Sequence, residues 1–481
     1  MKCFFSRLVV ATCVVLPTIS YAVNPMDVNG LLQVAVQTHP LVLAAVADET
    51  ASEEGVLAAK LNFLPTPTVS AGRSADYGVV SRVGVRQPLW SGGQLTANVN
   101  QAIYDNKAAT AYIYEQQNTV AKNTIDIWQS YIYAIALQDL YLQSLARLAD
   151  FEAMMQRRVA QGVSAKIELD LITNRILQDQ HAYQAAQEQE KIALARLQQM
   201  VGEPVQTGQS LPLAMLVRYA KQQSAGFSQL VLGDISQTNP SVVRQRFAVE
   251  AARHQARAQK AAQYPKLYAQ YEYAHYQKGR ENDSDLSWGL SYDPGAGFSN
   301  VALQRASQAR VESLVQNTEA VRRTVMENIQ TQYQQFVSSK DQELSLTTAV
   351  AGAQIVVNSY QRQFIAGRKS WLEVLNAVRE QSQYQQQLLQ VQSQMVANFF
   401  KLQVDFGVMP WQKVHTLQDV QEFHPYLQLT QWLAYQDPNP PEAFFEPMLD
   451  DIAPVNDVPD SATTNDSIAT DSATDTSPPA F

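Results

Sequence analysis

The sequence has 481 residues, a formal net charge of −9, 46% hydrophobic residues and two cysteines. The acidic balance excludes nucleic-acid binding through a broad basic face. Both cysteines, Cys3 and Cys13, lie near the amino terminus, so the rest of the chain has no thiol for a disulfide or a thiolate metal site.

The first 22 residues have the pattern of a secretory signal peptide. Lys2 and Arg7 precede an apolar run over residues 8–16, and the small residue Ala22 follows at a cleavage position. The run is shorter than the roughly 20 residues of a membrane-spanning helix, which disfavours a membrane anchor. A lipoprotein with its lipid on Cys13 is a weaker alternative than a cleaved signal peptide, because the apolar run continues past this cysteine. We therefore expect residues 1–22 to be removed on export.

The remaining chain repeats one order of motifs with a shift of about 200 residues. The matching pairs are QTHP at 37–40 with QTNP at 237–240, FLP at 63–65 with QYP at 263–265, Gly162 with Gly367, and Glu168 with Glu373. Such repetition predicts a first repeat over residues 23–230 and a second over 231–411. Each should contain a helix, a β-hairpin, a very long helix, a glycine turn and a returning helix.

The hairpins are expected at about residues 66–90 and 266–292. In DLSWGLSY at 285–292, large apolar residues alternate with Ser and Gly, as in a strand with one apolar face. Strands of about 10 residues are long enough to cross a bilayer when tilted. A buried sheet in a soluble protein would show a similar pattern.

The long helices are expected at about residues 94–161 and 298–366, which contain no proline. In the first of them apolar residues recur every seven positions, at Val120, Ile127, Ala134, Tyr141 and Leu148, which indicates a seam packed against another helix. The returning helices, about 165–200 and 370–406, are rich in glutamine. That composition suits either a water-filled lumen or a solvated coiled-coil surface.

Two hairpins supply only four strands, and an open sheet cannot face lipid because its edge groups would remain unpaired. Closure requires several chains, and three would supply twelve strands. We therefore predict a mainly α fold with a small β part, in which a homotrimer shares a twelve-stranded transmembrane β-barrel continued by a long α-helical barrel.

The order of elements resembles the TolC family of outer-membrane factors, from about Asn29 to Trp411. Two segments carry the resemblance: QPLWSGGQ at 87–94, which is similar to the family's strand-to-helix junction, and FIAGRKSWLEVLNA at 364–377, which is similar to its helix-turn-helix tip. The junction residues implied in the two repeats are Pro88, Gly92, Gly93, Pro294, Gly295 and Gly297. The resemblance implies an outer-membrane location with extension into the periplasm.

The resemblance also implies roles for the tips. Adaptor proteins would dock at Gly162, Val163 and Ser164 in one tip and at Gly367 and Arg368 in the other. Glu373 and Asn376 match positions of acidic rings at the periplasmic entrance, and Lys369 resembles a basic residue that locks that entrance. Because the second position is Asn, one of the two rings would be uncharged. An ordinary solvated helix charge is the alternative for Glu373.

The function implied is a passive exit duct in a tripartite type I secretion or efflux system. Its partners would be a periplasmic membrane-fusion adaptor, an inner-membrane transporter of the ABC or another type, outer-membrane lipid and a secreted protein substrate. The segment 367–380 resembles the branch that exports large adhesins. Multidrug efflux is the alternative, and a soluble periplasmic coiled-coil scaffold is a more distant one.

Little in the sequence points to an enzyme. Its six histidines are scattered, and it has no phosphate-binding glycine loop, nucleophile elbow or paired-histidine metal helix, so we expect no catalytic residue, cofactor or metal. After an equatorial segment at 412–436, the tail at 437–481 contains ten acidic residues and no Lys or Arg. We expect this tail to be disordered; a calcium-binding tail is disfavoured because a regular glycine-rich repeat is missing.

Overall fold

The computed structural model describes residues 28–205, 213–229, 237–293, 295–409, 411–412 and 422–423. All of them belong to one compact unit that ends at Pro425. The expected signal peptide at 1–22, Pro294, most of the segment at 412–436 and the acidic tail at 437–481 lie outside the described residues.

The described elements follow the same order twice. The first set is α1 (Val28–Thr38), α2 (Pro40–Leu61), β1 (Thr66–Ser74), β2 (Gly78–Trp90), α3 (Gln94–Ala160), α4 (Lys166–Val201), α5 (Leu213–Gln223) and η1 (Ser224–Gln229). The second set is α7 (Pro240–Ala261), β3 (Lys266–Tyr276), β4 (Asp283–Ser291), η2 (Ala296–Phe298), α8 (Ser299–Ile365) and α9 (Trp371–Asp405). The long helices α3 and α8 have 67 residues each, or roughly 100 Å at 1.5 Å per residue.

The helices α2 and α7 begin in the same way, which gives the sequence repeat a physical basis. His39 and Asn239 have extended backbones and accept hydrogen bonds from the amides of Leu41 and Ser241, at 3.2 and 3.1 Å. A proline follows each cap, where its missing N–H costs no helical hydrogen bond. The motifs QTHP and QTNP are therefore two copies of one helix start.

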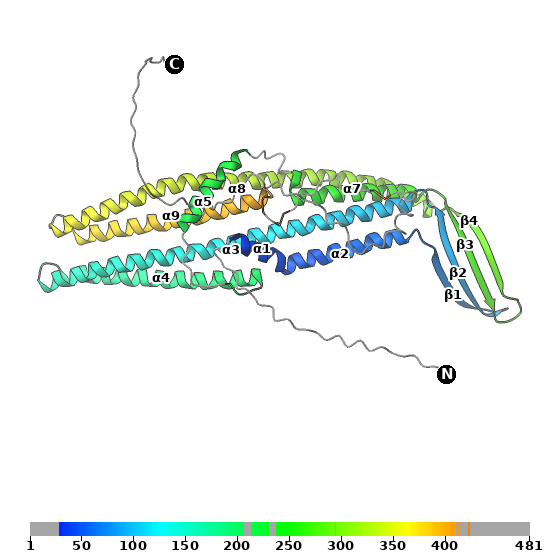
Figure 1. Ribbon diagram of the computed structural model, residues 1–481, viewed down its shortest axis with the longest axis horizontal. Coiled ribbons are helices and arrows are strands. Elements are labelled where there is room, and N and C mark those ends of the chain that lie inside the picture. The colour runs from blue at the N-terminus through cyan, green and yellow to red at the C-terminus, as the bar shows by residue number, and fades with distance from the viewer. Residues whose placement is uncertain are drawn as a thin grey trace, which may run out of the picture. The chain divides into compact units, whose positions relative to one another are not determined.

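The long helices run in the same general direction as the long axis of the view, with the four strands at one end and the glycine turns at the other (Figure 1). α3 packs against α2, α4, α7 and α9, and α8 packs against α7 and α9. Of the heptad positions in α3, Val120, Ala134, Tyr141 and Leu148 are buried, whereas Ile127 is half-buried. The apolar seam of α3 therefore holds the two repeats together.

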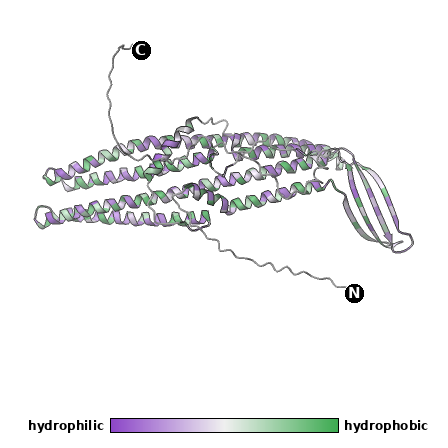
Figure 2. Ribbon diagram, viewed as in Figure 1, coloured by the Kyte–Doolittle hydropathy of each residue, from purple (hydrophilic) through white to green (hydrophobic). Residues whose placement is uncertain are grey.

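The largest core surrounds the middle of α3. There, the fully buried side chains of Trp128 and Tyr131 from α3 pack with Phe399 from α9 and with residues of α1 and α5. Figure 2 shows hydrophilic and hydrophobic residues interspersed along the long helices. Within the described ranges no single helix has the length and hydropathy of a membrane span; α1 and α2, bent by 47° between them, reach these values only as a pair.

The strands form one antiparallel sheet in the order β1-β2-β3-β4. Pairing of β2 with β3 joins the hairpins of the two repeats, with Val83 opposite Tyr273 and Val85 opposite Tyr271. Among the described strands, β1 pairs only with β2 and β4 only with β3. The sheet thus ends on two edges with unpaired backbone groups.

Candidate functional site

The turns at the ends of α3 and α8 have the same hydrogen-bonding pattern. Gly162 and Gly367 both have φ of 72°, a left-handed conformation that glycine adopts without steric cost. The amides of Gly162 and Val163 donate to the carbonyls of Val159 and Arg158, at 3.0 and 2.9 Å. The amides of Gly367 and Arg368 donate to Phe364 and Gln363, at 3.0 and 2.8 Å. Both turns are Schellman caps, which reverse the chain while pairing the last helical carbonyls.

The predicted docking residues differ in exposure. Val163 is 61% exposed and Arg368 is also exposed. Ser164 is half-buried and accepts a hydrogen bond from Arg158 Nε at 3.1 Å. Next to them, Ile167, Ile365 and Leu372 each leave more than half of their surface in solvent. The tips therefore present apolar surface around the two glycine turns.

Lys369 and Glu373 are brought together at the start of α9. Lys369 Nζ lies 2.5 Å from Glu373 Oε1 and 4.6 Å from the centre of the Tyr360 ring. The amide and hydroxyl of Ser370 donate to Glu373 Oε2 at 2.9 and 3.0 Å, and the Glu373 amide donates back to the Ser370 hydroxyl. This reciprocal capping box fixes the carboxylate at the helix N-terminus.

These contacts change the acidity of the pair. The hydrogen bond from Lys369, followed by those from Ser370, lowers the pKa of Glu373 from 4.5 to about 2. The hydrogen bond to Glu373 raises the pKa of Lys369. Asn376, three residues further along α9, is exposed. Glu373 is therefore charged over the whole physiological pH range, while its partner offsets part of that charge.

An aromatic cluster joins the two tips, and the sequence analysis did not identify it. Trp371 is 1% exposed, and its ring lies 5.5 Å from Phe151 of α3 and 5.0 Å from Phe364 of α8. The Arg158 guanidinium lies 4.7 Å above the Phe364 ring. Trp371 directly follows the Ser370 cap, so the packing of this cluster sets the position of Lys369 and Glu373. The only sequence signal was a tryptophan beside the glycine turn.

The strand-to-helix junctions depend on glycine in each repeat. Gly92 and Gly93 have φ of 65° and 86°, and a Cβ on Gly92 would lie 2.9 Å from the Tyr264 side chain. The ladder between β2 and β3 shifts register between Pro88 and Trp90. In the second repeat, Gly295 and Gly297 have φ of 79° and 62°.

The second junction differs from the first in one respect. Phe298, the residue before α8, has φ of 60°, a conformation that is strained for a residue with a Cβ. The equivalent long helix of the first repeat, α3, instead begins directly after Gly93. The Phe298 side chain is 66% exposed.

The sheet has one apolar and one polar face. The apolar face carries large side chains that are all exposed by 39% or more: Val69, Val83, Val85, Tyr271, Tyr273, Leu286, Trp288 and Leu290. Towards the hairpin turns the same face also carries Arg73, Ser81, His275 and Ser284. The opposite, polar face carries Thr66, Thr68, Ser70, Arg82, Arg86, Lys266, Tyr268, Gln270, Glu272, Asp283, Asp285 and Ser287. Such an apolar face without a cover is typical of contact with lipid or with another chain.

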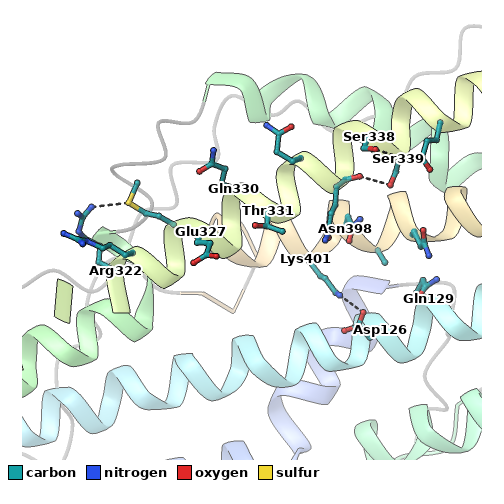
Figure 3. A pocket seen from close by; sticks show the side chains of 17 residues that line it. Asp126, Gln129, Arg322, Glu327, Gln330, Thr331, Ser338, Ser339, Asn398 and Lys401 are labelled. Atoms are coloured by element: carbon teal, nitrogen blue, oxygen red, sulfur yellow. Dashed lines mark hydrogen bonds and ion pairs between the residues drawn. The ribbon is translucent and has the colours of Figure 1, made fainter. Parts of the chain in front are cut away.

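A polar groove of about 1180 Å³ lies between α3, α8 and α9. Glutamine, serine and threonine from α8 form much of its lining. Lys401 of α9 reaches across to Asp126 of α3, with 2.5 Å between Nζ and Oδ1 (Figure 3). The described residues contain no group of three or more His, Cys, Asp or Glu side chains placed to hold a metal ion.

The comparisons with known proteins agree with this architecture. The model of a family described as outer membrane efflux protein matches residues 31–203 and again residues 231–404. The prediction of two repeats is confirmed by this double match. No curated protein matches the sequence.

Several solved channel structures share the fold. CusC superposes with a TM-score of 0.69 at 16% identity, covering 81% of this chain and 93% of that one. The outer membrane protein VceC from Vibrio cholerae gives 0.66 at 14% identity, covering 79% and 96%. The open state of the MtrE outer membrane channel from Neisseria gonorrhoeae gives 0.64 at 14% identity, covering 80% and 90%. At these identities the likeness is one of fold.

Proposed function

The chain belongs to the outer membrane efflux protein family, and from that premise we propose that three copies form one continuous duct for export. Proteins of this family are outer-membrane channels that extend into the periplasm, and this chain is one of them. In the proposed trimer, three four-stranded sheets close into a twelve-stranded barrel. The long helices of each chain continue this barrel as a helical tube.

The two open edges of the sheet carry the proposal. In lipid, every unpaired backbone N–H and C=O costs several kcal/mol, and β1 and β4 each leave one side of their backbone unpaired. Pairing of β1 in one copy with β4 in the next removes both edges at once. The exposed apolar face, with Trp288 80% and Val69 79% exposed, would then contact lipid on the outside of the barrel.

The glycine turns lie at the opposite end of the long helices from the sheet (Figure 1). If the sheet is in the membrane, the tips reach into the periplasm. The apolar surface around Val163 and Arg368 would there bind a membrane-fusion adaptor, with an ABC-type or other transporter in the inner membrane. Three copies of Glu373 would surround the entrance and favour cations.

We propose a large secreted protein, such as an adhesin, as the cargo. This choice rests on the resemblance of residues 367–380 to the adhesin-exporting branch. Small-molecule efflux is the second candidate, because it uses the same duct. A deletion strain that loses secretion of one protein but keeps its drug tolerance would support the first, and the reverse result would support the second.

The duct itself is tested by fractionation and conductance. We expect the protein to require detergent for extraction, to have the mass of three copies, and to form ion-conducting channels in planar bilayers. A protein that remains monomeric in buffer without detergent would instead be a periplasmic scaffold.

A further inference from the structure

On the polar face of the sheet, Arg86 lies in a tier that contains no acidic residue. The register places Thr66, Arg86, Gln270 and Ser287 in line across the four strands, and Arg86 is the only charged residue of that tier. The next tier towards the hairpin turns consists of Thr68, Gly84, Glu272 and Asp285. The tier beyond it, formed by Ser70, Arg82, Ala274 and Asp283, contains one charge of each sign. The acidic residues of this face therefore lie nearer the hairpin turns than Arg86.

The two arginines of this face differ in their partners. Arg82 Nε lies 3.3 Å from Glu272 Oε1, so a carboxylate offsets its charge. Arg86 donates from Nη2 and Nε to Gln270 Oε1, at 2.8 and 3.1 Å. In the described part of the chain, no carboxylate lies within ion-pair distance of Arg86. Arg86 therefore has no direct ion pair among these residues, and the amide that holds it donates in turn to Glu272 Oε2 at 3.2 Å.

A packed aromatic ring supports the Arg86 side chain. Its guanidinium carbon lies 4.5 Å from the centre of the Tyr268 ring, which adds a cation–π attraction. Tyr268 in turn lies on Gly289, where a Cβ would be only 2.6 Å from the ring. Gly289 thus leaves the space that this ring occupies, and Tyr268 and Gln270 together limit the positions open to the guanidinium.

From this arrangement we propose that Arg86 forms an anion-attracting ring inside the barrel, at the end of the sheet nearer the helices. The proposal rests on the proposed trimer, in which the apolar face meets lipid and the polar face lines the pore. Three unneutralised guanidiniums at one level would raise the local concentration of anions and of acidic groups on a passing cargo. The barrel would then oppose the cation preference expected at the Glu373 entrance.

Reversal potentials of the purified full-length channel in a potassium chloride gradient test this proposal. We expect Arg86→Gln to lower the chloride-to-potassium permeability ratio about threefold, and Arg86→Lys to preserve it. The effect of Arg86→Gln should shrink at 1 M salt, where the Debye length falls to about 3 Å. Arg73→Gln is the matched control, because it removes a positive charge from the opposite face of β1 and should leave the ratio unchanged.

A second variant keeps the test decisive if Arg86→Gln forms no channels. Gln270→Glu places a carboxylate where the amide now holds Arg86 and should lower the ratio in the same direction. Conducting channels whose ratio is unchanged in both variants would overturn the role of Arg86 while leaving the duct intact. A wild-type protein that never conducts would overturn the duct, and this inference with it.

Discussion

Lys369 Nζ lies 2.5 Å from Glu373 Oε1, across the capping box that starts α9. The same carboxylate thus caps a helix, pairs with a lysine and, in the proposed trimer, contributes to the entrance. Because Lys369 offsets part of the Glu373 charge, the two residues together set how strongly the entrance attracts cations.

The first prediction concerns the pH dependence of this entrance. The pKa of Glu373 is lowered to about 2, so its capping contribution is fully present above its ordinary pKa of 4.5 and is lost as the pH falls towards 2. Because the Glu373 carboxylate stays charged over this range, the cation preference of the entrance should be unchanged between pH 7 and pH 5. Lys369→Ala should increase cation preference at neutral pH and move its loss to a higher pH, as measured by reversal potentials.

Two variants serve as controls for that experiment. Glu373→Ala should lower cation preference, whereas Glu188→Ala removes an exposed carboxylate on α4 that pairs with Lys191 on the surface and should have no effect. If Glu373→Ala channels keep the wild-type selectivity, Glu373 is an ordinary capping residue.

The second prediction concerns the glycine turn at the tip. A side chain at Gly367, with φ of 72°, costs about 1 kcal/mol or more, so Gly367→Ala should weaken adaptor binding and lower the melting temperature slightly. Gly367→Pro should disturb docking more strongly, yet leave membrane insertion unchanged because the strands lie at the far end of α8. Adaptor affinity and detergent extraction measure the two effects separately.

Gly352, in the helix α8 that precedes the turn, provides the matched control. It has no positive φ, and a Cβ there would meet no atom within 4 Å, so Gly352→Ala should be neutral or stabilise the protein by up to about 1 kcal/mol. Equal losses of adaptor affinity at both glycines would contradict a specific role for the turn.

Much of the fold followed from local sequence signals. The mainly helical character, the small β part and the two repeats are confirmed. Their signals were proline-free runs, alternating strands and the repeated motifs QTHP and QTNP, which each depend only on neighbouring residues. The pairing of β2 with β3 depends on how distant segments meet, and Phe298 has a left-handed φ that is unusual for a residue with a Cβ. No local signal specified them.

The candidate site was predictable only in part. Gly367 and Glu373 lie beside a recognisable turn motif, whereas the burial of Trp371 depends on Phe151, which is 220 positions away in the chain. The isolation of Arg86 also required the register, since a one-residue slip would move it to the apolar face. The trimer and the docking roles of the tips remain predictions.

The third prediction concerns a buried polar link between α3 and α4. Asp179 is 2% exposed, and its carboxylate lies 3.1 Å from Arg175 and accepts a hydrogen bond of 2.6 Å from Ser144. Asp179→Ala should destabilise the protein by about 3 kcal/mol, because it leaves a partly buried guanidinium without its carboxylate. Lys191→Ala, which removes an exposed pair with Glu188, should leave the stability nearly unchanged, because solvent screens an exposed ion pair. Chemical denaturation of the two variants would measure the difference.

The last prediction separates packing from polarity at Trp371. Removing this buried ring in Trp371→Ala should cost about 3–5 kcal/mol, since Phe151 and Phe364 would then line a cavity. Trp371 Nε1 has no hydrogen-bond partner among the described residues, so Trp371→Phe also removes an unsatisfied donor, which would offset part of the lost packing. Trp371→Phe should therefore cost clearly less than Trp371→Ala, by thermal unfolding of the detergent-solubilised protein. If the two variants are equally destabilised, the indole N–H is bonded in the assembled protein and its hydrogen bond, not ring packing alone, holds the two tips together.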